Sequence, residues 1–174
     1  MDRPAKLEVL DGRTVLSIGF DDLVKYHGRA SVGGLALGFK ALELGLALVS
    51  PSAPPKRRDI EVRVAFDGPG SRDAFEMVTR AVTGGNYSVV PDLAPEGAPE
   101  APQGHFVFRV TYRGAAVDLT LRPGLVGDDF NSLVRKDSRT AAEEDLLVEM
   151  KEGLAARLLA LEACDVFDAV VTGP

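Results

Sequence analysis

The sequence predicts an α+β domain, in which an antiparallel-biased mixed sheet packs with a long, buried, glycine-rich helix and with further helices. Three observations lead to this prediction. Two segments have the alternation and the turn residues of hairpins, a third alternates like a single strand, and several longer segments have helical apolar spacing. Helical and strand segments occur in separate runs, which is typical of α+β domains. No internal repeat is visible, and 174 residues suit one domain spanning 1–174.

The first elements are a hairpin and a short helix. Apolar residues alternate over residues 7–19 on both sides of Asp11-Gly12, and Asp-Gly is a strong hairpin signal. Asp21 or Asp22 is expected to cap a short helix that ends near His27.

The central element is a helix over residues 32–49 that is apolar on all sides and therefore buried. Glycines inside a helix cost about 1 kcal/mol each relative to alanine. We expect close packing against a sheet, or against a second copy of the helix, to explain Gly34, Gly38 and Gly45 near one face. Lys40 and Glu43 in its middle favour a buried helix over a membrane span, so we expect no membrane association.

The rest of the chain alternates between strand, helix and loop signals. Thr140 and Glu143 form a capping-box signature at a helix start. The expected elements are a strand over 59–66, a helix capped by Ser71 and ending at Gly84-Gly85-Asn86, an irregular Pro/Gly-rich loop over 91–104, a hairpin over 106–121, a charged loop over 125–137, a helix from Thr140 to about residue 161, and a short turn or helix from Asp165.

Composition narrows the class of protein. The formal charge of −6 and the pI of about 5.0 disfavour binding to nucleic acid. The single cysteine, Cys164, excludes an internal disulfide and a multi-cysteine metal site within one chain. We expect Cys164 to be a buried thiol, with a reactive thiol as the alternative. One cysteine and the lack of an apolar leader at Met1–Lys6 indicate a cytoplasmic protein.

The most informative motif runs from Tyr26 to Gly38. It places His27, Arg29 and Ser31 within five positions, directly before the glycine-rich helix. A helix start exposes unpaired N–H groups and the positive end of the helix dipole, so such a place favours an anion. The backbone around Gly33 is expected to contribute N–H donors.

The order of these motifs resembles the FmdE-like family, named after a component of formylmethanofuran dehydrogenase, over roughly residues 20–125. That family has His-Gly-His-x-Cys-Pro-Gly before a glycine-containing helix, which corresponds to residues 27–33 here. Its later Cys-Gly-x-Asp-Ala turn corresponds to Gly70–Ala74, and its Gly-x-Gly-Asn-like helix end to Gly84–Asn86. The resemblance implies the fold, a homodimer and a metal site.

Several positions depart from the family pattern. Arg29 stands at the second motif histidine and Ser31 at the motif cysteine, while the other cysteines fall at Gly70 and near Ala81. The four-cysteine zinc ribbon of some relatives is absent from the sequence. His27, Asp73 and the glycine framework carry over. Since one imidazole beside a fixed cation is a poor site for a divalent metal, the prediction is a degenerate metal site that retains no cofactor.

The first hypothesis is therefore a homodimer that binds a small anionic or pterin-like ligand, without an assigned reaction. Its ligand-binding residues are His27, Arg29, Ser31, Gly33 and Asp73. Three alternatives stay open. In the first, Arg29 pairs with Asp67 or Asp73 and the pocket is vestigial. In the second, the protein keeps zinc or nickel through His27, either as a metal-dependent enzyme or as an accessory part of a molybdenum or tungsten oxidoreductase in one-carbon metabolism. In the third, it is a structural interaction protein within a larger complex.

Overall fold

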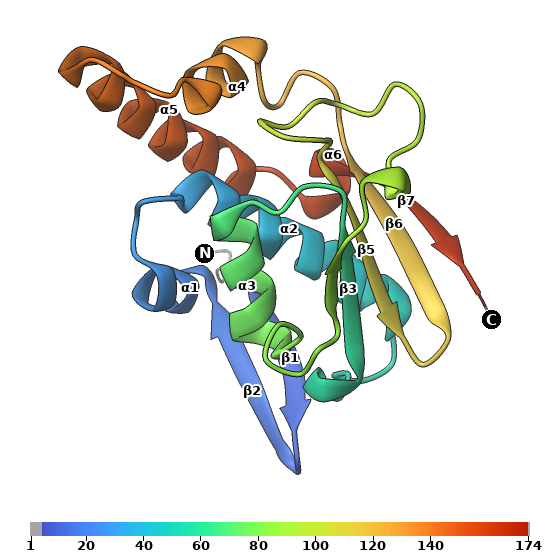
Figure 1. Cartoon of the computed structure of the whole chain (residues 1–174). Coiled ribbons are helices and arrows are strands. Elements are labelled where there is room, and N and C mark those ends of the chain that lie inside the picture. The colour runs from blue at the N-terminus through green and yellow to red at the C-terminus, as the bar shows by residue number, and fades with distance from the viewer. Residues whose placement is uncertain (1–4, 174) are drawn as a thin grey trace.

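Two sheets make up the β-structure of residues 5–173, the part of the chain described by the computed structural model (Figure 1). A five-stranded mixed sheet lies against helices on one side, and a separate antiparallel pair of strands extends below it (Figure 1). The predicted α+β class is confirmed.

The large sheet has the strand order β4-β3-β5-β6-β7. All neighbours are antiparallel except β3 and β4, which are parallel. The predicted hairpin is confirmed as β5 and β6, and in β6 the buried residues alternate with partly exposed ones. The strands are β3 (Ile60–Val64), β4 (Tyr87–Val89), β5 (Val107–Tyr112), β6 (Ala115–Leu121) and β7 (Phe167–Thr172).

The first hairpin is also confirmed, as β1 (Lys6–Asp11) and β2 (Thr14–Gly19). Helix α1 (Phe20–His27) follows at once, and Gly28, with φ of +85°, ends it. The predicted aspartate N-cap is wrong, because Gly19 occupies that position. Asp22 lies one turn inside the helix and accepts a hydrogen bond from the Gly19 N–H at 2.9 Å. That bond lowers the pKa of Asp22.

Helix α2 (Val32–Val49) has the predicted bounds and lies at the centre of the molecule (Figure 1). Its glycines do not all pack against one element, as a single glycine face would predict. Gly34 and Gly38 lie against α3 (Pro69–Thr79), while Gly45 contacts Val110 of β5. By length and composition α2 is the one helix among residues 5–173 that resembles a membrane span, but most of it is buried, as in core helices.

The predicted helix near Ser71 is present, but it begins earlier than expected and ends at Thr79, before the predicted Gly84-Gly85-Asn86. Gly68 is its N-cap and Pro69 its first residue, since proline has no N–H to leave unpaired there. The Ser71 hydroxyl donates to the Gly68 carbonyl at 3.1 Å instead of capping.

The C-terminal third differs most from the predictions. Helix α4 (Asp128–Arg135) replaces part of the expected charged loop, and strand β7 follows the short helix α6 (Ala163–Val166). Helix α5 (Ala141–Leu159) has the predicted capping box. Cys164 is exposed, so the expected buried thiol is wrong. Residues 91–104 are irregular apart from a 3₁₀ turn at Pro91–Leu93 and an isolated β-bridge from Glu100 to His105.

Candidate functional site

His27 and Asp73 form a pair between α1 and α3, 46 positions apart in the sequence. His27 Nδ1 lies 2.6 Å from Asp73 Oδ2, and the His27 side chain is 12% exposed. A carboxylate at this distance accepts a hydrogen bond from an Nδ1–H group and so fixes the orientation of the ring. Nε2 is buried and has no hydrogen-bond partner within residues 5–173. The pair lines neither of the two cavities described below.

Arg29 forms a bidentate ion pair with Glu152 of α5. Its Nε donates to Glu152 Oε1 at 2.8 Å and its Nη2 donates to Oε2. The pair holds the pKa of Glu152 below its ordinary value. The alternative in which Arg29 pairs with Asp67 or Asp73 is therefore wrong. Asp67 instead accepts a hydrogen bond from the Tyr87 hydroxyl at 2.7 Å.

Ser31 and Gly33 occupy the start of α2, as predicted, but they face different surroundings. Ser31 is the N-cap residue, and its carbonyl accepts from Leu35 N at 2.9 Å. Gly33 packs against α5, where a Cβ would lie 3.0 Å from Leu154 Cδ2. Of the five predicted ligand-binding residues, only Ser31 lines the cavity that lies nearby.

This cavity, termed here the apolar cavity, has a volume of about 170 Å³. It lies between the first turns of α2 and α3, the sheet, α4 and α5. Phe66 and Phe106 meet edge to face in its lining, with ring centroids 5.6 Å apart. Apolar side chains and glycines dominate its lining, which consists of Ser31, Gly34, Leu37, Phe66, Gly68, Pro69, Gly70, Ser71, Pro102, Phe106, Phe108, Phe130, Val134, Lys151 and Leu154.

Lys151 is the only charged residue among the described residues that line the apolar cavity. Its Nζ donates to the Ala30 carbonyl at 2.7 Å, which ties α5 to the segment before α2. Burial lowers the pKa of Lys151, and nearby Arg139 lowers it further. Sequence reasoning did not identify Lys151, because nothing local to α5 indicates that it reaches a residue 121 positions away.

The electrostatic character of the apolar cavity is positive. The starts of two helices contribute residues to it, Ser31 and Gly34 from α2 and Gly70 and Ser71 from α3. Helix starts carry partial positive charge, and within residues 5–173 no acidic side chain lines the cavity to offset it. The partly desolvated ammonium of Lys151, which bonds to the carbonyl directly before Ser31, adds a positive charge.

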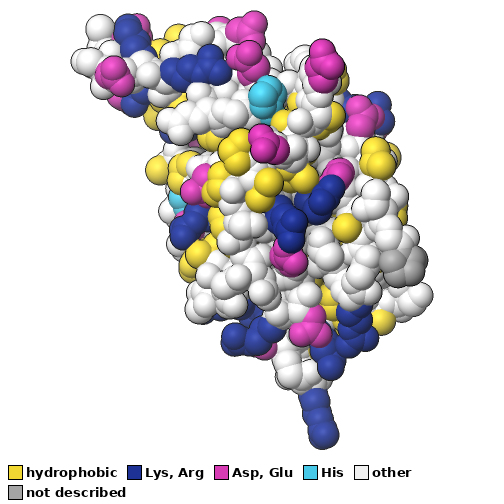
Figure 2. Space-filling view, turned by 45° about the vertical axis from the view of Figure 1, so that its right-hand side comes forward, with side chains coloured by type: hydrophobic (Ala, Val, Ile, Leu, Met, Phe, Trp, Pro, Cys, Tyr) yellow, Lys and Arg dark blue, Asp and Glu magenta, His cyan; other side chains and the backbone are white. Residues whose placement is uncertain are grey.

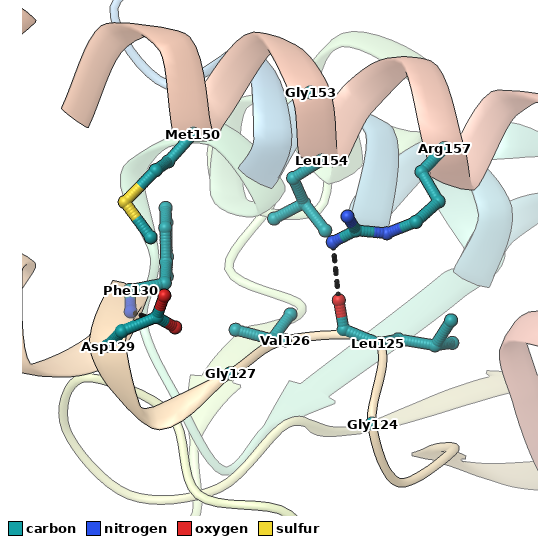
Figure 3. A pocket seen from close by; sticks show the side chains of 10 residues that line it. All are labelled: Gly124, Leu125, Val126, Gly127, Asp129, Phe130, Met150, Gly153, Leu154 and Arg157. Atoms are coloured by element: carbon teal, nitrogen blue, oxygen red, sulfur yellow. Dashed lines mark hydrogen bonds between the residues drawn. The ribbon is translucent and has the colours of Figure 1, made fainter. Parts of the chain in front are cut away.

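A second hollow of about 380 Å³ lies on the other side of Phe130 and Leu154, which line both spaces. Figure 3 shows its glycine-rich wall at 124–127 opposite Met150 and Arg157 of α5. Arg157 Nη2 donates to the Leu125 carbonyl at 2.8 Å (Figure 3). Since Asp129 and Arg157 both line it, this hollow has charges of both signs and favours neither an anion nor a cation.

No metal-binding cluster is evident in the described part of the chain. Residues 5–173 contain no group of three or more His, Cys, Asp or Glu side chains positioned to hold one ion. Figure 2 shows Lys and Arg interspersed with Asp and Glu on the face that it displays, rather than a patch of one sign.

Comparisons with known proteins assign no family. No protein-family profile matches this chain, and no curated protein is significantly similar to it. The resemblance to the FmdE-like family stays a prediction from the motifs.

Proposed function

We propose that this protein binds a small organic acid in the apolar cavity, with its hydrocarbon part inside and its carboxylate beside Lys151. The single observation behind this proposal is an otherwise uncharged, largely apolar cavity whose one charged residue, among the described residues that line it, is a partly desolvated lysine. Small-molecule sites in proteins combine a mostly apolar lining with a few polar groups in the same way.

The volume of the apolar cavity limits the size of the ligand. A dry apolar cavity of about 150 Å³ accommodates benzene. The 170 Å³ found here therefore matches one ring or a short branched chain. Phe66, Phe106 and Phe108 give it an aromatic lining that suits either shape.

The charge of the ligand follows from Lys151. An ammonium group has three N–H donors, and Ala30 accepts from one of them. Burial destabilises the charged ammonium and lowers its pKa, so a carboxylate beside it restores favourable interactions. The proposed ligand is therefore anionic, as in the first hypothesis. We propose that it binds beside Ser31 and Lys151 rather than between His27, Arg29 and Asp73.

Calorimetric titration with phenylacetate and phenylacetamide tests this proposal, since the two differ in charge but little in shape. We expect phenylacetate to bind about tenfold or more tightly, because hydrogen bonds to charged groups contribute about 1.5–3 kcal/mol. Equal affinities, or no binding of phenylacetate, would contradict the proposal.

Two variants separate charge from shape. Lys151→Met removes the charge and retains an unbranched side chain, so it should reduce the preference for the acid. Val134→Phe fills the apolar cavity and should abolish binding of both compounds. Lys136→Met, at the exposed Lys136–Glu143 ion pair, is the matched control and should change neither affinity.

A further inference from the structure

Strand β7 is an unprotected edge of the large sheet. It is last in the strand order and, within residues 5–173, pairs with β6 alone, from Phe167 to Thr172. Every second residue of an edge strand directs its N–H and C=O away from the sheet. Proteins usually protect such edges with lysine, proline or a bulge. β7 contains none of these, and Asp168 is its only charged residue.

Each face of β7 carries one exposed valine at this edge. Val170 and Val171 are 61% and 51% exposed, among the most exposed large hydrophobic residues of the described chain. Val171 pairs with buried Val117 and so points toward the helix-covered face, whereas Val170 pairs with Asp118 on the opposite face. A ligand on one face would cover only one of the two valines. A strand added to the edge covers both.

We propose that β7 pairs with β7 of a second copy of this chain, in antiparallel orientation about a twofold axis, to form one continuous ten-stranded sheet. This inference is independent of the proposed ligand. The second copy is favoured because β7 is complementary to itself. A twofold axis perpendicular to the sheet keeps each residue on its own face of the sheet. Two residues that pair across the axis must therefore both have even numbers or both have odd numbers.

Among the registers that meet this condition, the one centred on Val170 has the most favourable cross-strand neighbours. It places Val170 opposite Val170, Ala169 opposite Val171, and Asp168 opposite Thr172. Both exposed valines gain apolar cross-strand neighbours, and no like charges meet. Centring the pair on Asp168 instead would place two carboxylates opposite each other, which is unfavourable.

The opposite edge of the sheet does not offer the same opportunity. Strand β4 has only three residues, and a 3₁₀ helix begins at Pro91, after a single intervening residue. Val89 of β4 is nevertheless 47% exposed, so it provides a matched control for surface hydrophobicity.

Sedimentation equilibrium of the full chain tests this proposal. The wild type should be a dimer at micromolar concentration, and Val170→Lys or Val170→Asp should each weaken dimerisation by about tenfold or more, because like charges then meet at the twofold axis. Val89→Lys should dimerise like the wild type. Unchanged circular dichroism will establish that the variants fold.

The two variants together test the register. A mixture of Val170→Lys and Val170→Asp chains should form a heterodimer, because opposite charges now face each other across the axis. A monomeric wild type overturns the proposal. The edge of β7 would then be available to a strand of a different protein. A dimer that both Val170 variants leave unchanged overturns it as well, since the interface must then lie elsewhere.

Discussion

At the scale of single residues, Glu76 illustrates how a buried charge is retained. Its side chain is buried near the end of α3, and burial alone would raise its pKa. Thr83 offsets this by donating to the carboxylate from its hydroxyl and, at 3.0 Å, from its N–H, while Arg80 lies 3.1 Å away. The net result is a pKa below the ordinary value, so the folded protein prefers the ionised form.

Glu76→Gln should therefore destabilise the protein in a pH-dependent way. We expect it to lower the free energy of unfolding by about 1–3 kcal/mol at neutral pH, because a charged acceptor is lost from a buried network. A lowered native pKa stabilises the fold above the ordinary pKa of the carboxyl, and that contribution disappears as the pH falls through the native pKa. Urea unfolding of both proteins between pH 7 and pH 3 will measure the difference, which should shrink on acidification. A difference that is independent of pH would indicate a packing effect instead.

The residue scale also shows what the motif analysis was able to predict. The motif identified His27 and Asp73, and the structure brings the two into contact. It did not identify Glu152 as the partner of Arg29, because the two are 123 positions apart and only tertiary packing joins them. Motifs report the local backbone and the residue types present. Which side chains meet depends on how α5 returns over the start of α2.

At the scale of elements, the close contact of α2 and α3 depends on missing side chains. A Cβ added to Gly38 would lie 2.6 Å from Ala74 Cβ and 3.1 Å from the Ser71 backbone. Gly38→Ala should therefore force the helices apart and lower the free energy of unfolding by about 1–3 kcal/mol, as overpacking does. Thermal or urea unfolding will measure it.

Gly153 of α5 is the matched control for this substitution. A Cβ there would meet nothing within 4 Å. Gly153→Ala should stabilise the protein by about 0.5–1 kcal/mol through helix propensity. Stabilisation by both substitutions would show that the α2–α3 contact relaxes more easily than its geometry implies.

Element prediction succeeded where a local signal was strong. Apolar residues fixed the bounds of α2, and Asp11-Gly12 located the first hairpin. Helix α4 was missed because flanking charges and glycines outweighed the helical spacing of Phe130, Leu133 and Val134. Strand β7 was missed because its identity depends on pairing with β6, which begins about fifty positions earlier.

At the scale of the whole molecule, stability should be distributed unevenly between the two sheets. The strands β3, β5 and β6 contribute many fully buried side chains to one continuous core around α2. The β1–β2 pair contributes Leu7, Val9 and Ile18, while Val15 near its turn is 50% exposed. Two-stranded sheets are marginally stable without support. Outside its own pairing, β1 is held by a backbone hydrogen bond from Leu10 N to Pro55 O at 2.8 Å.

Hydrogen exchange should reveal this difference directly. Amides of β1 and β2 should exchange through local opening, faster than those of β3 and β5, which exchange only when the core unfolds. Val9 of β1 is fully buried on the core-facing side of the hairpin, so Val9→Ala should accelerate exchange in β1 and β2 more than in β3 and β5. Mass spectrometry of peptic fragments resolves the two regions. If β1 and β2 exchange as slowly as β3 and β5 in the wild type, the hairpin unfolds only with the core, and the two sheets are one cooperative unit.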